Sequence, residues 1–228
     1  MKKRNYFFSI ILLGLLFVSC KKETRDKLKK AKETISNTST MVKDANTVKD
    51  NIEKLQKATP LTNAQLKTWL PEQLKGMQRK SFKVGASQYA NIASIEGKYD
   101  TPNVPTHIED DEGKRMVNPL KKSFSIQLYD GAGPMGGMMI TGLGMAAKMD
   151  FEEESEFEHK KTVVVRGVKA LQTVKKPRTP NTPYKVQIQF VFNERFGVMV
   201  NSASMNVEEV WNTIQDLDLE SLSKEASS

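Results

Sequence analysis

Apolar and polar residues alternate along several stretches in the second half of the chain, and this alternation predicts β-strands. It is clear over residues 123–131 and most regular over 184–192, and residues 161–174 are expected to form one or two further strands. A period of two is typical of strands that bury one face. Two residues separate 184–192 from another alternating stretch at 195–203, and this short connection predicts a β-hairpin.

Helical patterns lie before, within and after these strands. We expect a short helix capped by Asn63, and a buried helix within the small, apolar and methionine-rich stretch 132–149. A last helix over 207–217 is expected to start at a cap formed by Asn206 or Ser204. Residues 100–122 are expected to form a loop, because they hold three prolines and a run of charge.

The order of these elements predicts the fold class. Strands cluster late, with helices at the ends and in one insertion, which favours an α+β domain with an antiparallel sheet and packed helices over 60–223 and a tail over 224–228. The closing sequence RFGVMVNSASMNVEEVWNTIQDLDLESL resembles the end of several uncharacterised exported bacterial domains, where a strand beginning with Arg-Phe precedes a capped helix and an Asp-Leu-x-x-Leu finish. The resemblance implies the same α+β class and no activity.

Residues 23–57 form a highly charged segment that contains neither Gly nor Pro and carries a narrow helical stripe. The spacing of the stripe is typical of a coiled-coil seam or of a helix that lies against a partner. Few of its residues are large, so a solvated helical stalk over 20–59 is favoured over an oligomerising coiled coil. The stripe consists of Leu28, Ala31, Ile35, Val42, Ala45, Val48, Ile52 and Leu55.

The first residues have the pattern of an export signal. Three basic residues, Lys2, Lys3 and Arg4, precede a nearly uncharged run over 6–18. This run of 13 residues is shorter than a membrane-spanning helix, which needs about 20. A signal peptide over 1–19 is therefore favoured over a membrane anchor helix.

Cys20, the only cysteine of the chain, follows this run, so an intramolecular disulfide is excluded. The segment Phe17-Val18-Ser19-Cys20 resembles the lipobox of bacterial lipoproteins, with Phe17 where Leu is usual. The resemblance implies that the Cys20 thiol receives a diacylglycerol, that the chain is cut before Cys20, and that the new amino group is acylated. It also implies a protein of the cell envelope, lipid-anchored to the outer membrane or to the periplasmic face.

The net charge of +8 falls by three, to +5, when the basic residues of the signal peptide are removed. Seven of the remaining basic residues lie at 21–32, beside Cys20, where they favour contact with an anionic membrane surface. The expected partners are therefore the membrane, through the lipid on Cys20, and a protein or a lipid. A nucleic acid partner is not expected.

Residues 131–136 contain the motif G-x-G-x-x-G between a predicted strand and a predicted helix. Asp150 or Glu152 lies near the distance of the ribose-binding acid of a dinucleotide site. However, Pro134 removes a backbone donor where the pyrophosphate would bind, and the sequence FEEESEFEHKK replaces the parallel strand that should follow. We therefore expect the glycines to form a tight turn with close helix packing, and we expect no cofactor.

Five methionines follow the first glycine of this motif, at 135, 138, 139, 145 and 149. Thioethers are ligands for Cu(I), but no His or Cys lies among them, and their helical spacing also fits a core face. A third interpretation is an adaptable apolar pocket for a lipid or a peptide, lined by Met138, Met139 and Leu143.

Carboxylates gather at 150–158, before His159, and at 109–112, close to His107. Neither group has the spacing of a calcium loop or a zinc site, and no nucleophile motif occurs, so no metal and no catalytic residue is assigned. The leading interpretation is a non-enzymatic binding module at the cell envelope. The alternatives are an envelope enzyme that uses these carboxylates and a structural spacer with an oligomerising stalk.

Overall fold

The structure, a computed structural model, describes residues 47–86, 92–179 and 181–227. The chain forms two compact units, Met1–Asp50 and Asn51–Ser228. In the first unit the described residues 47–50 are helical, and the predicted signal peptide, Cys20 and most of the predicted stalk lie outside the described residues. No helix among the described residues is both long and apolar enough to cross a membrane.

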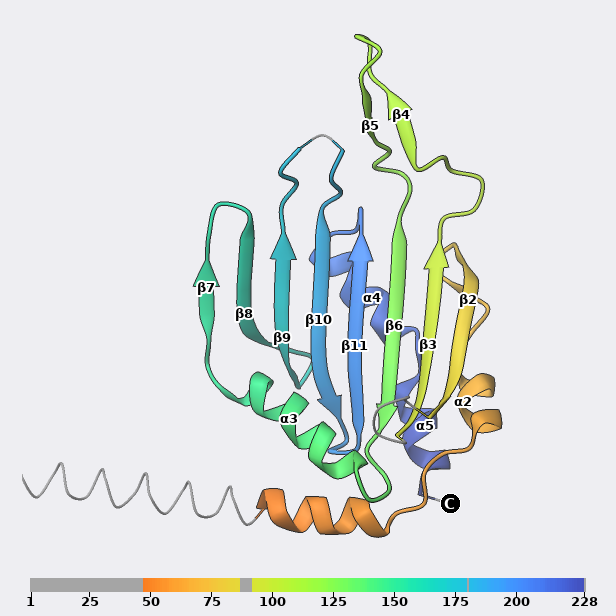
Figure 1. Ribbon diagram of the computed structural model, residues 1–228, viewed down its shortest axis with the longest axis vertical. Coiled ribbons are helices and arrows are strands. Elements are labelled where there is room, and N and C mark those ends of the chain that lie inside the picture. The colour runs from red at the N-terminus through yellow and green to blue at the C-terminus, as the bar shows by residue number, and fades with distance from the viewer. Residues whose placement is uncertain (1–46, 87–91, 180, 228) are drawn as a thin grey trace, which may run out of the picture. The chain divides into compact units, whose positions relative to one another are not determined.

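A nine-stranded sheet forms the centre of the second unit, in the order β1-β2-β3-β6-β11-β10-β9-β8-β7 (Figure 1). All neighbouring strands pair antiparallel, which confirms the predicted α+β class with an antiparallel sheet. The strands are β1 Gln73–Leu74, β2 Met77–Ala86, β3 Ala93–Asp100, β6 Ser123–Asp130, β7 Glu152–Glu154, β8 Glu158–Val165, β9 Val168–Lys175, β10 Lys185–Phe192 and β11 Phe196–Ala203.

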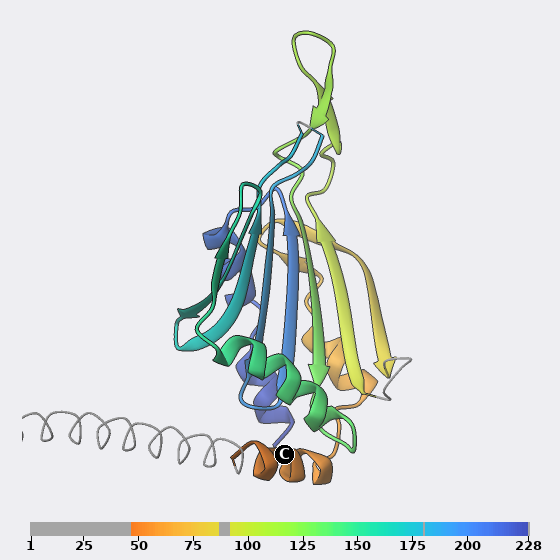
Figure 2. The ribbon, with the colours of Figure 1, turned by 60° about the vertical axis from the view of Figure 1, so that its left-hand side comes forward.

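Helices cover the two faces of this sheet unequally. Helices α2 (Asn63–Trp69), α4 (Val207–Gln215) and α5 (Leu219–Glu225) lie on one face, whereas α3 (Gly136–Lys148) crosses only one end of the other face (Figures 1 and 2). Residues 51–57 of this unit are also helical. The main core therefore lies between the sheet and α2, α4 and α5.

The core forms because alternate residues of the central strands point toward these three helices. In β6 the buried apolar residues are Phe124, Ile126 and Leu128, and on the neighbouring β11 the residues opposite Ile126 and Leu128 are Val200 and Val198. Each fully buried side chain of this kind stabilises the fold by about 1.5–3 kcal/mol. The alternation that predicted the strands is therefore the pattern that builds the core.

The structure corrects the predicted N-terminal cap of α2 and confirms that of α4. The prediction for α2 was wrong by one residue: Asn63 is the first helical residue, and Thr62 is the cap. Thr62 is favoured because a glutamine follows three residues later, and Thr62 and Gln65 exchange two hydrogen bonds in a capping box. Of the two predicted caps of α4, Asn206 and Ser204, the cap is Asn206, in the same arrangement with Glu209.

Residues 100–122 do not form a loop throughout, which corrects the prediction. They contain a hairpin of β4 (His107–Glu109) and β5 (Arg115–Val117), which projects beyond the end of the large sheet (Figure 1). Strands of three residues are too short to give a clear alternation in sequence. Asp110 closes the turn, because its Oδ1 accepts hydrogen bonds from the backbone N–H groups of Glu112 and Lys114.

Two tight turns join β8 to β9 and β10 to β11. Arg166 and Gly167, between β8 and β9, have φ angles of 53° and 81°. Asn193 and Glu194, between β10 and β11, have φ angles of 46° and 55°, which confirms the predicted hairpin. Two consecutive positive φ angles are typical of the type I′ turn. The first turn places Arg166 where its side chain reaches α4.

Candidate functional site

Helix α3 holds the three residues that were predicted to line a pocket, and it presents them on different sides. Leu143 faces the sheet, since a Cβ added to Gly197 would lie 2.6 Å from Leu143 Cδ1. Met138 is exposed and Met139 is half-buried. Only one side of α3 is buried, so the predicted buried helix was wrong for its other side. The cavities described below are lined by other residues, and the pocket at Met138, Met139 and Leu143 stays a prediction.

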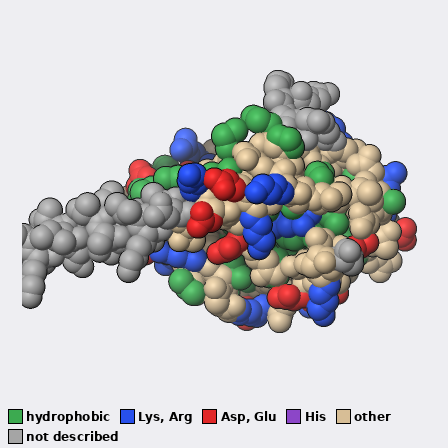
Figure 3. Space-filling view, turned by 90° about the horizontal axis from the view of Figure 1, so that it is seen from below, with side chains coloured by type: hydrophobic (Ala, Val, Ile, Leu, Met, Phe, Trp, Pro, Cys, Tyr) green, Lys and Arg blue, Asp and Glu red, His purple; other side chains and the backbone are tan. Residues whose placement is uncertain are grey.

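The outer side of α3 carries a row of apolar residues in solvent. Met135, Met138, Met145 and Met149 are 48% to 65% exposed, and Gly142 lies between the two pairs. Their steps of 3, 4, 3 and 4 residues are typical of a helix that packs on another helix. Seen from below, hydrophobic side chains are visible on the surface of the molecule (Figure 3). We call these five residues the methionine row.

A mostly apolar cavity of about 290 Å³ lies on the opposite face of the sheet, between the β8–β9 turn and helices α4 and α5. Three segments that are far apart in sequence build it: the turn with its flanking strand ends, the end of β10, and the facing sides of the two helices. We call it the apolar cavity. Its apolar lining consists of Val165, Val168, Phe190, Phe192, Trp211, Ile214 and Leu219. Four exposed polar residues complete it, namely Arg166, Gln215, Asp218 and Glu220.

Trp211 forms a fixed wall of the apolar cavity. Its ring centroid lies 6.0 Å from that of Phe190, a separation that is favourable for aromatic pairs. Its Nε1–H donates to Oε1 of the buried Gln172 at 3.2 Å, so the polar end of the indole is satisfied within the core. Trp211 is 7% exposed, so only a narrow apolar edge of its ring faces the cavity.

Arg166 lies at the mouth of the apolar cavity. Its guanidinium donates one hydrogen bond to Gln215 Oε1 at 2.5 Å and another to Asn212 Oδ1 at 2.9 Å. Both acceptors are on α4, so the turn is tied to the helix across the cavity. No sequence pattern indicated this site, because its residues come together only when the sheet and the two C-terminal helices are assembled.

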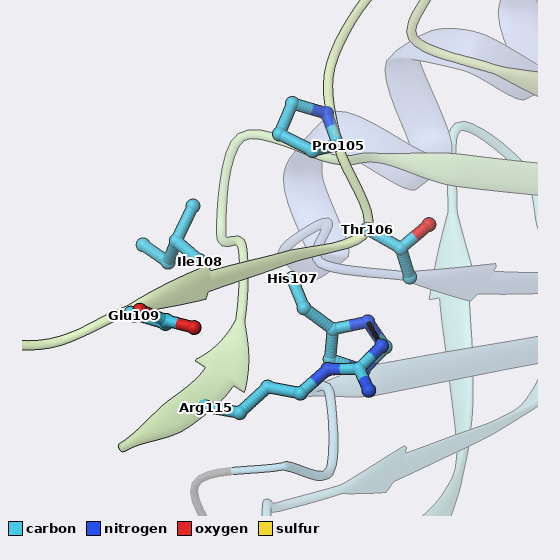
Figure 4. Close-up of a pocket in the computed structure, with 6 residues that line it drawn as sticks. All are labelled: Pro105, Thr106, His107, Ile108, Glu109 and Arg115. Atoms are coloured by element: carbon cyan, nitrogen blue, oxygen red, sulfur yellow. Dashed lines mark hydrogen bonds between the residues drawn. The ribbon is translucent and has the colours of Figure 1, made fainter. Parts of the chain in front are cut away.

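A second hollow, of about 530 Å³, lies along the projecting hairpin (Figure 4). His107 and Arg115 point toward each other in it, with His107 Nδ1 and the Arg115 guanidinium nitrogen 3.0 Å apart. Few residues line this hollow, most of them are polar, and it is open to solvent. Within the part of the chain that the structure describes, no group of three His, Cys, Asp or Glu residues could hold a metal ion.

The open face of the sheet beyond α3 holds a third hollow, of about 200 Å³. Five of its nine lining residues are polar, and two of these satisfy each other: Gln187 Nε2 donates to Asn201 Oδ1 at 2.8 Å. Leu171 and Met199 are among its apolar members. A ligand on this face would have to replace hydrogen bonds that already exist, so the face is a weaker candidate than the apolar cavity.

The carboxylates at 150–158 line one edge of the sheet. Glu152, Glu153 and Glu154 form the exposed edge strand β7, and His159 Nε2 lies 2.8 Å from Glu152 Oε1. Charged residues on an edge strand oppose pairing with further strands. The run therefore has a structural role at the sheet edge, and the contact between His159 and Glu152 fits that role.

A buried ion pair that sequence did not indicate closes the lower end of the sheet. Asp130, which is 0% exposed, accepts hydrogen bonds from Arg195 Nε at 2.7 Å and from a terminal nitrogen of Arg195 at 2.9 Å. It also accepts from the backbone N–H groups of Leu61 and Ala132. Because every oxygen and charge here has partners, the pair is a structural clasp and not a reactive site.

The G-x-G-x-x-G motif forms a turn that lets α3 pack closely, as predicted. A Cβ added to Gly131 would lie 2.5 Å from Ile140 Cγ1 and 2.6 Å from the backbone oxygen of Arg195. Gly133 has a φ angle of 92°, which favours glycine. The strand after α3 is β7 at the far edge of an antiparallel sheet, so the parallel strand of a dinucleotide-binding unit is not formed here.

Among these features, the apolar cavity combines the largest set of apolar side chains with oriented polar groups at its mouth. Such a combination is typical of sites for small molecules. Comparison of the chain with protein-family models, with curated proteins and with solved structures found no match. Function is therefore inferred from the apolar cavity and from the surfaces around it.

Proposed function

We propose that the protein is a lipid-anchored, exported binding module that holds a small apolar molecule in the apolar cavity. The anchor is Cys20, on the basis of its resemblance to a lipobox. The observation that carries the binding function is the cavity itself, in which seven apolar side chains surround a space that opens to solvent. Covering such a concave apolar surface with an apolar ligand is favourable, because it removes the surface from water.

The size of the apolar cavity restricts the ligand. Its volume of about 290 Å³ is at the lower end of the range for small-molecule sites, roughly 300–1,000 Å³. An alkyl chain of medium length fits this volume better than a complete membrane lipid. An anchored protein would meet such molecules at the membrane surface, where they concentrate because burial of each methylene is favourable by about 0.8 kcal/mol.

Two valine variants of the same hairpin test the proposal. Val168 lines the apolar cavity, whereas Val164 is on the other face of the sheet and is exposed. In the full chain carrying Cys20→Ser, we expect calorimetric titration with 1-octanol to show saturable binding. We expect Val168→Phe to weaken it at least about tenfold, a loss of about 1.4 kcal/mol, and Val164→Phe to leave it unchanged. Equal binding by both variants, or no saturable binding by the parent, would contradict the proposal.

The methionine row favours a second candidate function, the docking of an apolar helix of a partner protein. Its seam-like spacing fits a helix, and Gly142 leaves room for close approach, since a Cβ there would meet no described atom within 4 Å. Flexible methionines also suit surfaces that adapt to a partner. A photo-crosslinker at position 145 should then capture one defined protein in the host membrane, and Met138→Glu should abolish the product. Absence of a product that depends on Met138 would exclude this function.

A further inference from the structure

Arg166 gives the apolar cavity a second chemical feature, a fixed positive charge at its mouth. The two groups that hold its guanidinium, the side chains of Gln215 and Asn212, are neutral amides. They are three residues apart, so they lie on one side of α4 and bind the guanidinium together. They orient the charge and do not neutralise it. Within the described part of the chain, Arg166 forms no ion pair with a carboxylate.

The backbone at Arg166 is in a conformation that few residues with a side chain adopt. Its φ angle of 53° lies in the left-handed region, which is disfavoured for L-residues other than Asn and Asp. The first position of a type I′ turn is therefore usually Asn, Asp or Gly. An arginine there is a strained choice, as is Glu194 in the β10–β11 turn, so the strain accompanies the site and does not by itself identify it.

We infer that the apolar cavity binds a molecule with one alkyl chain and one carboxylate, and that Arg166 binds the carboxylate. This inference rests on the proposed function and specifies its ligand. A guanidinium has five N–H donors in a fork that matches a carboxylate. Arg166 uses two of them on Gln215 and Asn212, and donors remain for a ligand. The alkyl chain would then lie along Phe192 and Trp211 in the apolar cavity.

The other charged groups at the mouth limit the ligand to one negative charge. Asp218 and Glu220 line the same cavity. Asp218 Oδ1 accepts a hydrogen bond from the backbone N–H of Ser221, which holds that carboxylate at the start of α5. The two carboxylates in the lining repel a ligand with a second negative charge more strongly than one with a single charge, because like charges at close range disfavour binding. A monocarboxylate therefore fits better than a phosphate monoester or a dicarboxylate.

A pair of ligands that differ in the head group tests this inference. We would titrate octanoate and 1-octanol into the full chain carrying Cys20→Ser and measure binding by calorimetry. We expect octanoate to bind at least about tenfold more tightly than octanol, since hydrogen bonds between a guanidinium and a carboxylate are stronger than those to a neutral hydroxyl. In Arg166→Gln this preference should be lost, so that octanoate binds no more tightly than octanol to the same variant. Arg178→Gln, at another exposed arginine, is the matched control and should behave as the parent.

A second variant covers the case in which Arg166→Gln does not fold. Gln215→Glu places a carboxylate against the guanidinium, so the internal ion pair should compete with octanoate. The ratio of octanoate affinity to octanol affinity should then fall at least about tenfold relative to the parent. Equal affinities of the parent for octanoate and octanol would overturn the carboxylate inference and leave the proposed function standing. Failure of both ligands to bind would overturn the inference and the proposed function together.

Discussion

Removal of the Asp130 carboxylate is the perturbation for which the structure gives the clearest expected magnitude. In Asp130→Ala, the Arg195 guanidinium loses two charge-assisted hydrogen bonds and keeps two to backbone oxygens, those of Ala226 and Thr59. The Leu61 N–H group also loses its acceptor. Breaking a buried ion pair by removing one partner costs about 3–5 kcal/mol, because the other charge stays buried.

This free energy converts into a measurable change of Tm. For a unit of 150–250 residues, each 1 kcal/mol of destabilisation lowers Tm by roughly 2–4 °C, so the expected decrease for Asp130→Ala is about 6–20 °C. The matched control is Asp150→Ala, which removes the same side chain from an ion pair with Lys169 in which Asp150 is 97% exposed. An exposed pair contributes at most about 1 kcal/mol, so this variant should unfold close to the wild type.

Thermal unfolding followed by circular dichroism measures both variants under the same conditions. If the Asp130–Arg195 ion pair stabilises this end of the sheet, Tm must fall much more in Asp130→Ala than in Asp150→Ala. It also requires that Arg195→Ala and the double variant show coupling in a double-mutant cycle, since the two side chains act as one unit. If the two aspartate variants unfold at the same temperature, or if the cycle shows no coupling, the clasp does not stabilise this end of the sheet.

Three further predictions use other parts of the chain. Gly131→Ala should destabilise the protein by about 1–3 kcal/mol, because its Cβ would collide with a backbone oxygen. Gly142→Ala, on the open side of α3, should stabilise it by about 0.5–1 kcal/mol, because alanine has the higher helix propensity. Urea unfolding measures both changes. The Lys122 side chain lowers the pKa of Glu209 below its ordinary value, so this ion pair stabilises the fold above about pH 4.5 and is lost as the pH falls through the lowered pKa. Glu209→Gln, which can keep the helix cap, should therefore lower Tm at pH 7, and the difference from the wild type should disappear at acidic pH; a constant difference would contradict the assignment. Cys20→Ser should prevent lipidation, so the protein should be released from membranes or remain unprocessed in fractionated cells, and full cleavage with unchanged membrane attachment would refute the lipobox.

The parts of the fold that were predictable are those in which the local pattern and the tertiary environment agree. The strand over 184–192 has helices on one side and a more open face on the other, so its alternation is regular and its limits in sequence nearly match β10. The stretch 132–149 was harder, because small and apolar residues occupy both sides of α3. Nothing in the local sequence shows that only the side with Ile140 is covered by the sheet.

The apolar cavity was not predictable for a different reason. Val168, Phe192 and Trp211 each belong to a pattern that reads as ordinary core, and only the order of the strands brings them together. Arg166 appears in sequence as one residue of an Arg-Gly pair, which is consistent with a simple turn. Its role depends on the neutral amides of α4, 46 and 49 residues later. Site prediction here needed the strand order of the sheet, which periodicity alone does not determine.

The central claim, that the apolar cavity binds a small amphiphilic molecule, is tested most directly by methyl NMR of the full chain carrying Cys20→Ser in the presence of octanoate. With the methyl groups of Ile, Leu, Val and Met labelled, intermolecular nuclear Overhauser effects report which side chains touch the alkyl chain. The account predicts contacts from octanoate to the methyl groups of Val168, Ile214 and Leu219, which line the cavity. Contacts confined to the methionine row, or none at all, would contradict it.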